Sequence, residues 1–288
     1  MVMSKKKTPP AEAAPANAYI QAATQYLNQG KPRKAITELN RALRDDSKNA
    51  EAYNLRGLVR ALEGDFVMAL ADFNQAIRHN PQNAAAYLNR ANLQLELGNP
   101  KQAIPDFSEA LRIGCPVTEV VYFHRGTAHF ELGEHDAALR DFNQALALKP
   151  DFAEAYHARG DLRRLKIDLG GAIADYSAAI RLNPKAPIPY IRRAELMHAQ
   201  RRYDEAIADY NIVIGLEPHV PDWYVERGKL YDRKGEEAKA IADYERYVGL
   251  GGSRSSMEVL AVNRRIFHLR LKTLLTPQHY KSRVWFTD

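Results

Sequence analysis

The feature that most constrains this chain is a short phrase that returns every 34 or 35 residues. The phrase is an alanine, then Ile or Leu, then a large apolar residue four positions after the alanine, and it occurs seven times. A fixed period of this length is the signature of a repeat architecture, in which each copy is one supersecondary unit. Seven copies account for roughly residues 16 to 252. The marker alanines are Ala35, Ala69, Ala103, Ala138, Ala172, Ala206 and Ala240.

Each copy carries the spacing of two helices. With the marker alanine numbered as position 20, apolar or small residues fall at positions 4, 8 and 11–12, and again at 20, 24 and 27, which is helical spacing. A glycine at or beside position 15 ends the first helix in most copies, and a proline near position 32 stops the second. The fifth copy, with "RLKIDLGG", has no such glycine, so the pattern leaves its turn undefined. The glycines are Gly30, Gly64, Gly98, Gly133 and Gly235, and the prolines are Pro81, Pro150, Pro184 and Pro218.

Six copies also place an arginine at position 7 and an aspartate at position 23. Both positions lie eight residues from the turn, so an antiparallel hairpin brings them level. We expect a partly buried ion pair that fixes the register of each hairpin, rather than a ladder of charges for a ligand. The expected pairs are Arg56 with Asp72, Arg90 with Asp106, Arg125 with Asp141, Arg159 with Asp175, Arg193 with Asp209, and Arg227 with Asp243.

These repeats resemble the tetratricopeptide repeat family over about four fifths of the chain, because the period and the small, aromatic and proline positions are in register. The resemblance implies an all-α fold, a right-handed α-solenoid of seven helix-turn-helix repeats with a C-terminal capping helix. One hairpin cannot bury its own apolar faces, whereas stacked hairpins can. The related pentatricopeptide family, whose members read RNA, shares the hairpin but looks different at the small and proline positions.

The pattern divides the chain into four parts. Residues 1–16 are expected to be a disordered basic tail, 17–252 the seven-repeat superhelix, 253–272 a capping helix and 273–288 a basic and aromatic tail. In the capping segment an apolar set should cover the open end of the stack, and in the last segment Trp285 and Phe286 are exposed unless they fold back. The capping set is Leu260, Ile266, Phe267, Leu269 and Leu271.

The net charge of +6 is carried by the ends of the chain. Residues 1–16 contribute +2 and residues 251–288 contribute +5, which leaves −1 for the body. A nearly neutral body argues against a phosphate-binding solenoid, because such a surface should carry a basic stripe. No window is apolar and long enough to span a bilayer, and the amino-terminal segment lacks the apolar core of a secretory signal, so we expect a cytoplasmic protein.

The sequence contains no constellation typical of catalysis. It has no phosphate-cradling glycine loop, no zinc-ligand spacing and no nucleophile beside a base, and the single cysteine, Cys115, lies in a turn without His or Lys next to it. We therefore expect no enzyme activity, no cofactor and no metal. His124, His157 and His198 could face one groove, but they come from separate repeats, and histidines in a polar groove explain them more simply.

The resemblance implies a concave groove lined by first helices, which suits a peptide or partner segment. The first hypothesis is a scaffold or adaptor that binds a protein partner there. The alternatives are a self-assembling structural protein that uses an end repeat or the C-terminal tail, and an RNA-associated protein that uses its basic tails. Phe123 and Phe130 are either aromatic anchors for a partner or packing residues between repeats. The expected groove residues are Asn54, Asn89, Asn92, Phe123, His124, Thr127, Phe130, His157, Asp161, Arg164, Arg192, Glu195, His198, Glu226, Lys229 and Asp232.

Overall fold

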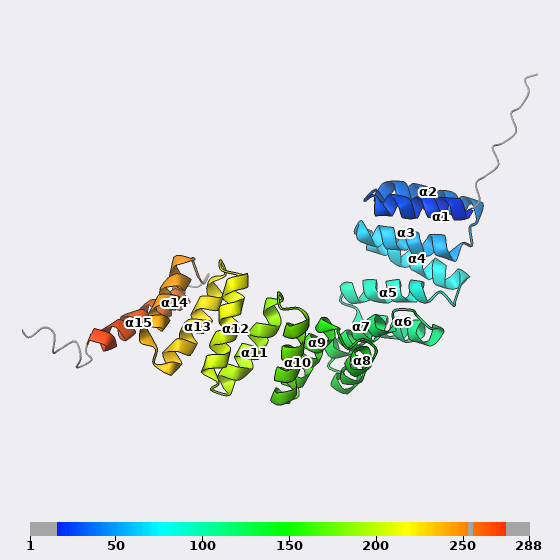
Figure 1. The fold of residues 1–288 in the computed structure, drawn as a ribbon. Helices are drawn as coiled ribbons and strands as arrows, with labels where there is room; N and C mark the ends of the chain where they lie inside the picture. Colours follow the sequence, from blue (N-terminus) through cyan, green and yellow to red (C-terminus); the bar gives the residue numbers. More distant parts are fainter. Residues whose placement is uncertain (1–15, 253–255, 275–288) are drawn as a thin grey trace, which may run out of the picture. The chain divides into compact units, whose positions relative to one another are not determined.

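The structure, a computed structural model, describes residues 16–252 and 256–274. In this part of the chain all regular secondary structure is α-helical, and short turns connect the helices (Figure 1). The helices in the first half are α1 (Ala16–Asn28), α2 (Pro32–Asp45), α3 (Ala50–Leu62), α4 (Phe66–His79), α5 (Ala84–Glu96), α6 (Pro100–Ile113), α7 (Thr118–Glu131) and α8 (His135–Leu148). The helices in the second half are α9 (Ala153–Leu165), α10 (Leu169–Leu182), α11 (Pro187–Ala199), α12 (Tyr203–Leu216), α13 (Pro221–Lys234), α14 (Glu237–Gly249) and α15 (Ser256–Leu274).

The chain forms two compact units, Met1–Pro150 and Asp151–Asp288. The first unit holds four hairpins, α1/α2 to α7/α8, and the second holds three, α9/α10 to α13/α14, followed by α15. Within each unit every hairpin packs against the next one, as Figure 1 shows. The two-helix reading of each copy is therefore confirmed, and the second helices end two residues before the prolines of four copies.

Tight turns join the two helices of each hairpin and require a left-handed residue. Five of these residues are the expected glycines, with φ between 68° and 81°. The fifth and sixth repeats instead place Ile167 (φ 64°) and Arg201 (φ 59°) there. Because a Cβ atom disfavours this conformation, a β-branched isoleucine is strained in it.

The small residue at position 8 makes room for the ring at position 24. A Cβ atom added to Gly160 would lie 2.7 Å from Cε1 of Tyr176, and one added to Gly57 would lie 2.7 Å from Cε1 of Phe73. Both rings are buried in their hairpins. Removing the side chain at position 8 thus lets the aromatic ring lie directly on the backbone of the opposite helix.

All six Arg and Asp positions meet in the hairpins. In each pair the arginine Nε and Nη2 donate to the two carboxylate oxygens of the aspartate, at 2.6 to 3.0 Å. The aspartates are buried, with 2 to 7% of each residue exposed. Such two-pronged geometry gives direction as well as charge to the contact. Hydrogen bonding to Asp209 raises the pKa of Arg193 above its ordinary value.

The same arginines also tie a hairpin to the one before it. Nη1 of Arg193 donates to Oγ of Ser177 at 2.8 Å, and Nη1 of Arg227 donates to Oδ1 of Asn211 at 2.7 Å. The tyrosine at position 4 lies beside each guanidinium, with 5.9 Å from its ring centre to the Arg193 carbon. One side chain therefore holds both the register of a hairpin and its contact with the preceding repeat.

The last helix packs on the final hairpin through two buried residues, Ile266 and Leu269, which join the cluster around Tyr244 and Tyr247. Its basic side chains reach acidic ones on α13 and α14, as in the two hydrogen bonds from Arg265 to Asp232. Arg270 and Lys272 pair likewise with Glu245 and Glu237.

The capping prediction was wrong for three of its five residues. Leu260, Phe267 and Leu271 are 53%, 61% and 39% exposed. They lie on the side of α15 away from Ile266 and Leu269, because a single helix can turn only one stripe toward the hairpin it covers. Trp285 and Phe286 lie outside the described residues.

Candidate partner-binding site

The first helices of the hairpins carry the residues that we expect to bind a partner, namely α3, α5 and α7 in the first unit and α9, α11 and α13 in the second. We call the surface they share the first-helix face, and it is described for each unit by itself. Its residues sit at fixed positions of the repeat, so the Arg–Asp pairs and the turn residues that fix each hairpin also fix their spacing.

In the first unit, amide side chains connect neighbouring repeats. Nδ2 of Asn89 on α5 donates to Oδ1 of Asn54 on α3 at 3.0 Å. Asn54 is only 8% exposed, so its amide serves mainly this contact. Asn92, one turn further along α5, is partly exposed, and its Oδ1 is buried without a hydrogen-bond partner in the described part of the chain.

The aromatic residues of α7 both pack and remain partly accessible. The ring of Phe123 lies 6.1 Å from that of Phe142, centre to centre, and the ring of His124 stacks on Phe107 at 6.2 Å. Burial lowers the pKa of His124, which favours its neutral form. Phe130 contacts the ring of His135 at the end of the hairpin. Phe123 and Phe130 therefore contact rings of their own repeat, and His124 contacts a ring of the preceding repeat.

Thr127 offers little to a ligand, because its hydroxyl donates to the backbone carbonyl of Phe123 at 3.0 Å. This is the bond to the preceding turn that threonine commonly makes inside a helix.

In the second unit, Asp161 on α9 is the centre of a polar cluster. Its Oδ1 accepts a hydrogen bond from the Tyr176 hydroxyl at 2.7 Å, and its Oδ2 lies 3.4 Å from Nε2 of His157. Arg192 on α11 approaches the same carboxylate at 4.0 Å. Burial, followed by the bond to Asp161, raises the pKa of Tyr176, so the hydroxyl stays protonated and keeps donating.

Further along this face, basic side chains form ion pairs with acidic side chains three residues away on the same helix. Arg192 lies 3.2 Å from Glu195, and Lys229 lies 2.6 Å from Glu226. His198 contacts the ring of Tyr203. Asp232 holds α15 through Arg265, so its carboxylate is already engaged by the last helix.

Several expected groove residues have buried polar atoms that no described residue satisfies. They are Oδ1 of Asn92, Nε2 of His157, and Nε of Arg164 and of Arg192. Buried polar atoms are rarely left without a partner, since each costs free energy unless something bonds it. Both units therefore have partly exposed side chains on the first-helix face that each carry an unpaired polar atom.

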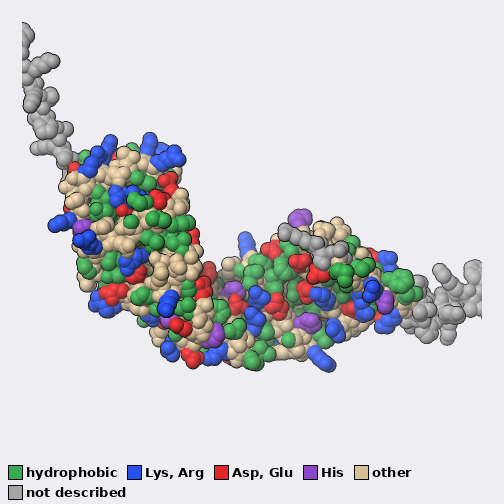
Figure 2. Space-filling view, turned by 180° about the vertical axis from the view of Figure 1, so that it is seen from behind, with side chains coloured by type: hydrophobic (Ala, Val, Ile, Leu, Met, Phe, Trp, Pro, Cys, Tyr) green, Lys and Arg blue, Asp and Glu red, His purple; other side chains and the backbone are tan. Residues whose placement is uncertain are grey.

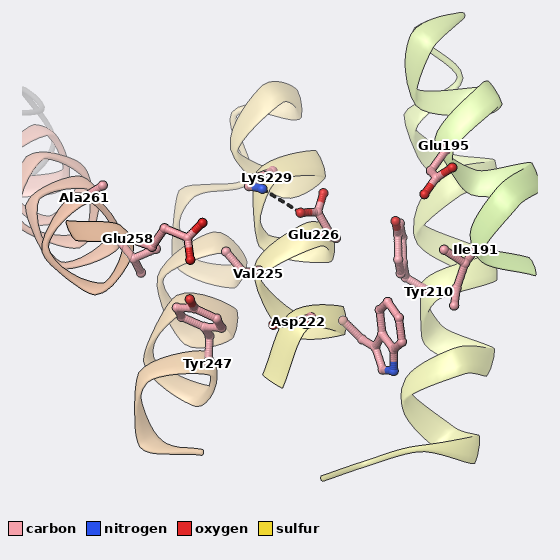
Figure 3. A pocket seen from close by; sticks show the side chains of 12 residues that line it. Ile191, Glu195, Tyr210, Asp222, Val225, Glu226, Lys229, Tyr247, Glu258 and Ala261 are labelled. Carbon is pink, nitrogen blue, oxygen red and sulfur yellow. Dashed lines mark hydrogen bonds and ion pairs between the residues drawn. The ribbon is translucent and has the colours of Figure 1, made fainter. Parts of the chain in front are cut away.

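A pocket of about 590 Å³ opens on this face in the second unit, between α11, α13 and α15 (Figure 3). Apolar residues and buried aromatic rings form part of its wall, and carboxylates from three helices form the rest. The lining residues are Ile191, Glu195, Tyr210, Asp222, Trp223, Val225, Glu226, Lys229, Tyr247, Glu258, Ala261 and Val262.

Sequence reasoning missed most of this pocket. Ile191 and Val225 occupy the same repeat position as Phe123, and Asp222 lies one helical turn before Val225, so the repeat positions of the expected groove could have found them. Tyr210 belongs to a second helix, and its signal was the change from Phe to Tyr at position 24 in the last three copies. The residues of α15 follow no repeat, so no period could have placed them.

The described residues offer no other obvious chemistry. Among them, no group of three or more His, Cys, Asp and Glu is arranged to hold a metal ion. None of the described helices has both the length and the apolar character to cross a membrane. On the side shown in Figure 2, blue basic and red acidic side chains are interspersed and form no continuous basic stripe.

Two sequence-family models match separate stretches of the chain. One, described as TPR repeat, matches residues 23–64 and 126–163, and the other, described as tetratricopeptide repeat, matches residues 63–114 and 193–255. Together these stretches overlap all seven copies of the 34- to 35-residue repeat. No curated protein sequence matches the chain significantly.

Solved structures with a similar fold include tetratricopeptide repeat proteins. A tetratricopeptide repeat protein from Parabacteroides merdae ATCC 43184 is 22% identical with a TM-score of 0.60, over 88% of this chain and 98% of its own. The pilF protein of Pseudomonas aeruginosa is 20% identical with a TM-score of 0.64, over 70% of this chain and 92% of its own. YrrB, described as a TPR protein with an unusual peptide-binding site, is 19% identical with a TM-score of 0.55, over 62% of this chain and 92% of its own. The repeat period, the helical hairpins and these matches together show that the chain belongs to the tetratricopeptide repeat family.

Proposed function

We propose that the chain is a non-enzymatic scaffold that binds a peptide segment of a protein partner on its first-helix face. The observation that carries this proposal is the set of buried polar atoms without partners on that face, at Asn92, Arg164 and Arg192. All three side chains are partly exposed, so a segment lying across the first helices of either unit would contact them, and a small rotation of each side chain would bring its unpaired atom to the segment's polar groups. That YrrB is described as having a peptide-binding site supports the idea that this fold can carry one.

The aromatic side chains of α7 suit the same role. Phe123 and Phe130 are partly exposed beside polar neighbours, although each also contacts a ring of its own unit. An aromatic side chain with part of its surface available can add a large contact area at low cost in entropy. We also propose that the protein acts in the cytoplasm, where protein partners are available to it.

Affinity capture with two matched triple variants tests the proposal. The first replaces Asn92, Arg164 and Arg192 with alanine on first helices, and the second replaces Gln144, Arg78 and Arg181, which are exposed on second helices. Once circular dichroism shows both variants folded, the first should lose the partner that wild type retains, and the second should keep it. Equal retention by both variants would exclude the first-helix face.

A second candidate function, self-assembly through α15, is favoured by the apolar side chains on its outer surface. Met257, Leu260 and Phe267 are more than half exposed and follow helical spacing. Exposed apolar patches often mark protein interfaces. Light scattering over a range of concentrations should then show a dimer that Phe267→Glu abolishes and Gln144→Glu, at an exposed position of α8, does not. A monomer at every concentration would exclude this candidate.

A further inference from the structure

The pocket between α11, α13 and α15 has an excess of negative charge. Its lining includes four carboxylates, Glu195, Asp222, Glu226 and Glu258, against the single ammonium of Lys229. Lys229 already pairs with Glu226 at 2.6 Å, as the dashed line in Figure 3 shows. The formal charge of the lining is therefore negative, and the neighbouring guanidinium of Arg192, which pairs with Glu195, only reduces the excess.

These charges also act on a neutral group inside the pocket, the hydroxyl of Tyr210. Burial raises the pKa of Tyr210, and the negative charges of Glu226 and Glu195 raise it further, while Arg192 opposes them. The hydroxyl thus lies in a region where a further negative charge is disfavoured. An anionic ligand would meet the same repulsion.

The remaining walls of the pocket suit the aliphatic part of a long side chain that ends in a positive group. Tyr210, Trp223 and Tyr247 present aromatic surface, and Ile191 and Val225 present aliphatic surface. Aromatic faces attract cations as well as apolar groups, so a long basic side chain can use both kinds of wall. The indole Nε1 of Trp223 donates to Glu217 at 2.9 Å, which holds the ring in place.

The last helix is needed to complete the pocket. It adds Glu258, Ala261 and Val262 opposite the residues of α11 and α13, and Figure 3 shows Glu258 and Ala261 on the α15 side facing Val225 and Lys229. The ion pair of Arg265 with Asp232 holds α15 in this position. The repeat alone would offer an open surface, whereas α15 gives it a third wall.

We propose that this pocket receives a lysine or arginine side chain of the partner's segment. The inference rests on the proposed function, because it names the chemistry of one part of the segment that the first-helix face binds. The guanidinium or ammonium group lies among the carboxylates of α11, α13 and α15, and the aliphatic stem lies against the aromatic walls. A segment with an acidic side chain at the same place is rejected.

A titration with small probes tests the pocket without knowledge of the partner. The full chain has two tryptophans, Trp223 and Trp285, so the indole region of a ¹⁵N spectrum contains two signals, which a Trp285→Phe variant assigns. The probes are N-acetyl methylamides of arginine, lysine and glutamate. The arginine or lysine probe should shift the Trp223 signal saturably with a millimolar Kd, and the glutamate probe should not.

The carboxylates are tested by a double variant with a matched control. Glu195→Gln with Glu226→Gln should weaken binding of the basic probes at least about fivefold, since two opposite charges are lost. Glu154→Gln, at the position of the fifth repeat equivalent to Asp222, lies outside the pocket and should leave binding unchanged. Added salt should weaken binding to wild type as well. No saturable shift, or an equal response to the glutamate probe, would overturn the proposal.

A third variant separates this proposal from the proposed function. Ala261→Arg places a positive charge on the exposed, pocket-lining side of α15 and leaves Ile266 and Leu269 untouched. It should abolish the probe shift and lower capture of the partner at least about fivefold. If the partner is captured as well as by wild type, through Asn92, Arg164 and Arg192, the pocket proposal is wrong and the proposed function stands. If those three residues do not matter for capture, the proposed function fails, whatever the probes show.

Discussion

At the scale of single residues, two chain positions carry strain that the repeat normally avoids with glycine. Ile167 and Arg201 adopt the left-handed conformation at the turns of the fifth and sixth repeats. Ile167 is 80% exposed, so packing gives little in return for the strain. The absence of glycine in "RLKIDLGG" was visible in the sequence, but the turn it would adopt was not, because neighbouring helices impose the conformation.

Replacing Ile167 with glycine should therefore stabilise the protein by about 1 kcal/mol, because it removes the Cβ clash of the left-handed conformation. Urea denaturation should show the gain as a higher midpoint with an unchanged slope. Gly133→Ala is the reciprocal control: its φ is 74° and no atom lies within 4 Å of an added Cβ. It should cost a similar amount, and a neutral result for both variants would contradict the explanation.

The second residue-scale prediction concerns the Arg–Asp pairs. Asp209 has 5% of its side chain exposed and Arg193 has 20%. Arg193→Met leaves a buried carboxylate unpaired and should cost about 3 kcal/mol, as should Asp209→Asn within a factor of two. The double variant should cost less than the sum of the two. Arg202→Met, at an exposed pair with Glu205, should leave the midpoint unchanged, and fully additive losses at Arg193 and Asp209 would show that the two do not couple.

At the scale of elements, the period predicted the hairpins well and the last helix poorly. The helical spacing occurs in all seven copies, and the glycines and prolines occur in most of them, so a copy that lacks one signal can be interpreted from the others. The segment 256–274 occurs once, and hydrophobic residues on both of its sides gave no indication of which side would pack. Ile266 and Leu269 face the hairpin, whereas Leu260 and Phe267 face outward.

This difference predicts opposite effects for two substitutions on α15. Leu269 is 2% exposed within the cluster around Tyr244 and Tyr247, so Leu269→Ala should cost about 2–4 kcal/mol and loosen the last repeat. Phe267→Ala removes an exposed ring from the same helix and should change little. Hydrogen exchange should rise in α13 to α15 for Leu269→Ala only, because repeats transmit their stability mainly to neighbours. Equal effects of the two variants would refute the assignment of the packed side.

At the scale of the whole molecule, the sequence predicted which helices would carry the expected groove residues better than it predicted the contacts of those residues. The expected groove residues lie on first helices, but the sequence could not show that Asp232 holds α15 or that Thr127 bonds its own backbone. The role of Asp232 depends on contacts between α13 and α15, which share no period, whereas the Thr127 bond lies within α7. The pocket depends on them most, because α15 supplies one of its walls.

The central claim is that a partner segment lies on the first-helix face, and site-specific photo-cross-linking tests it most directly. A photoreactive phenylalanine analogue is placed at Glu96 or Lys229 on first helices, and at Arg78 or Ala174, which are exposed on second helices. Irradiation in cells should give adducts of one partner from Glu96 and Lys229 and none from Arg78 and Ala174. Adducts from Arg78 and Ala174 with none from the first helices would contradict the claim.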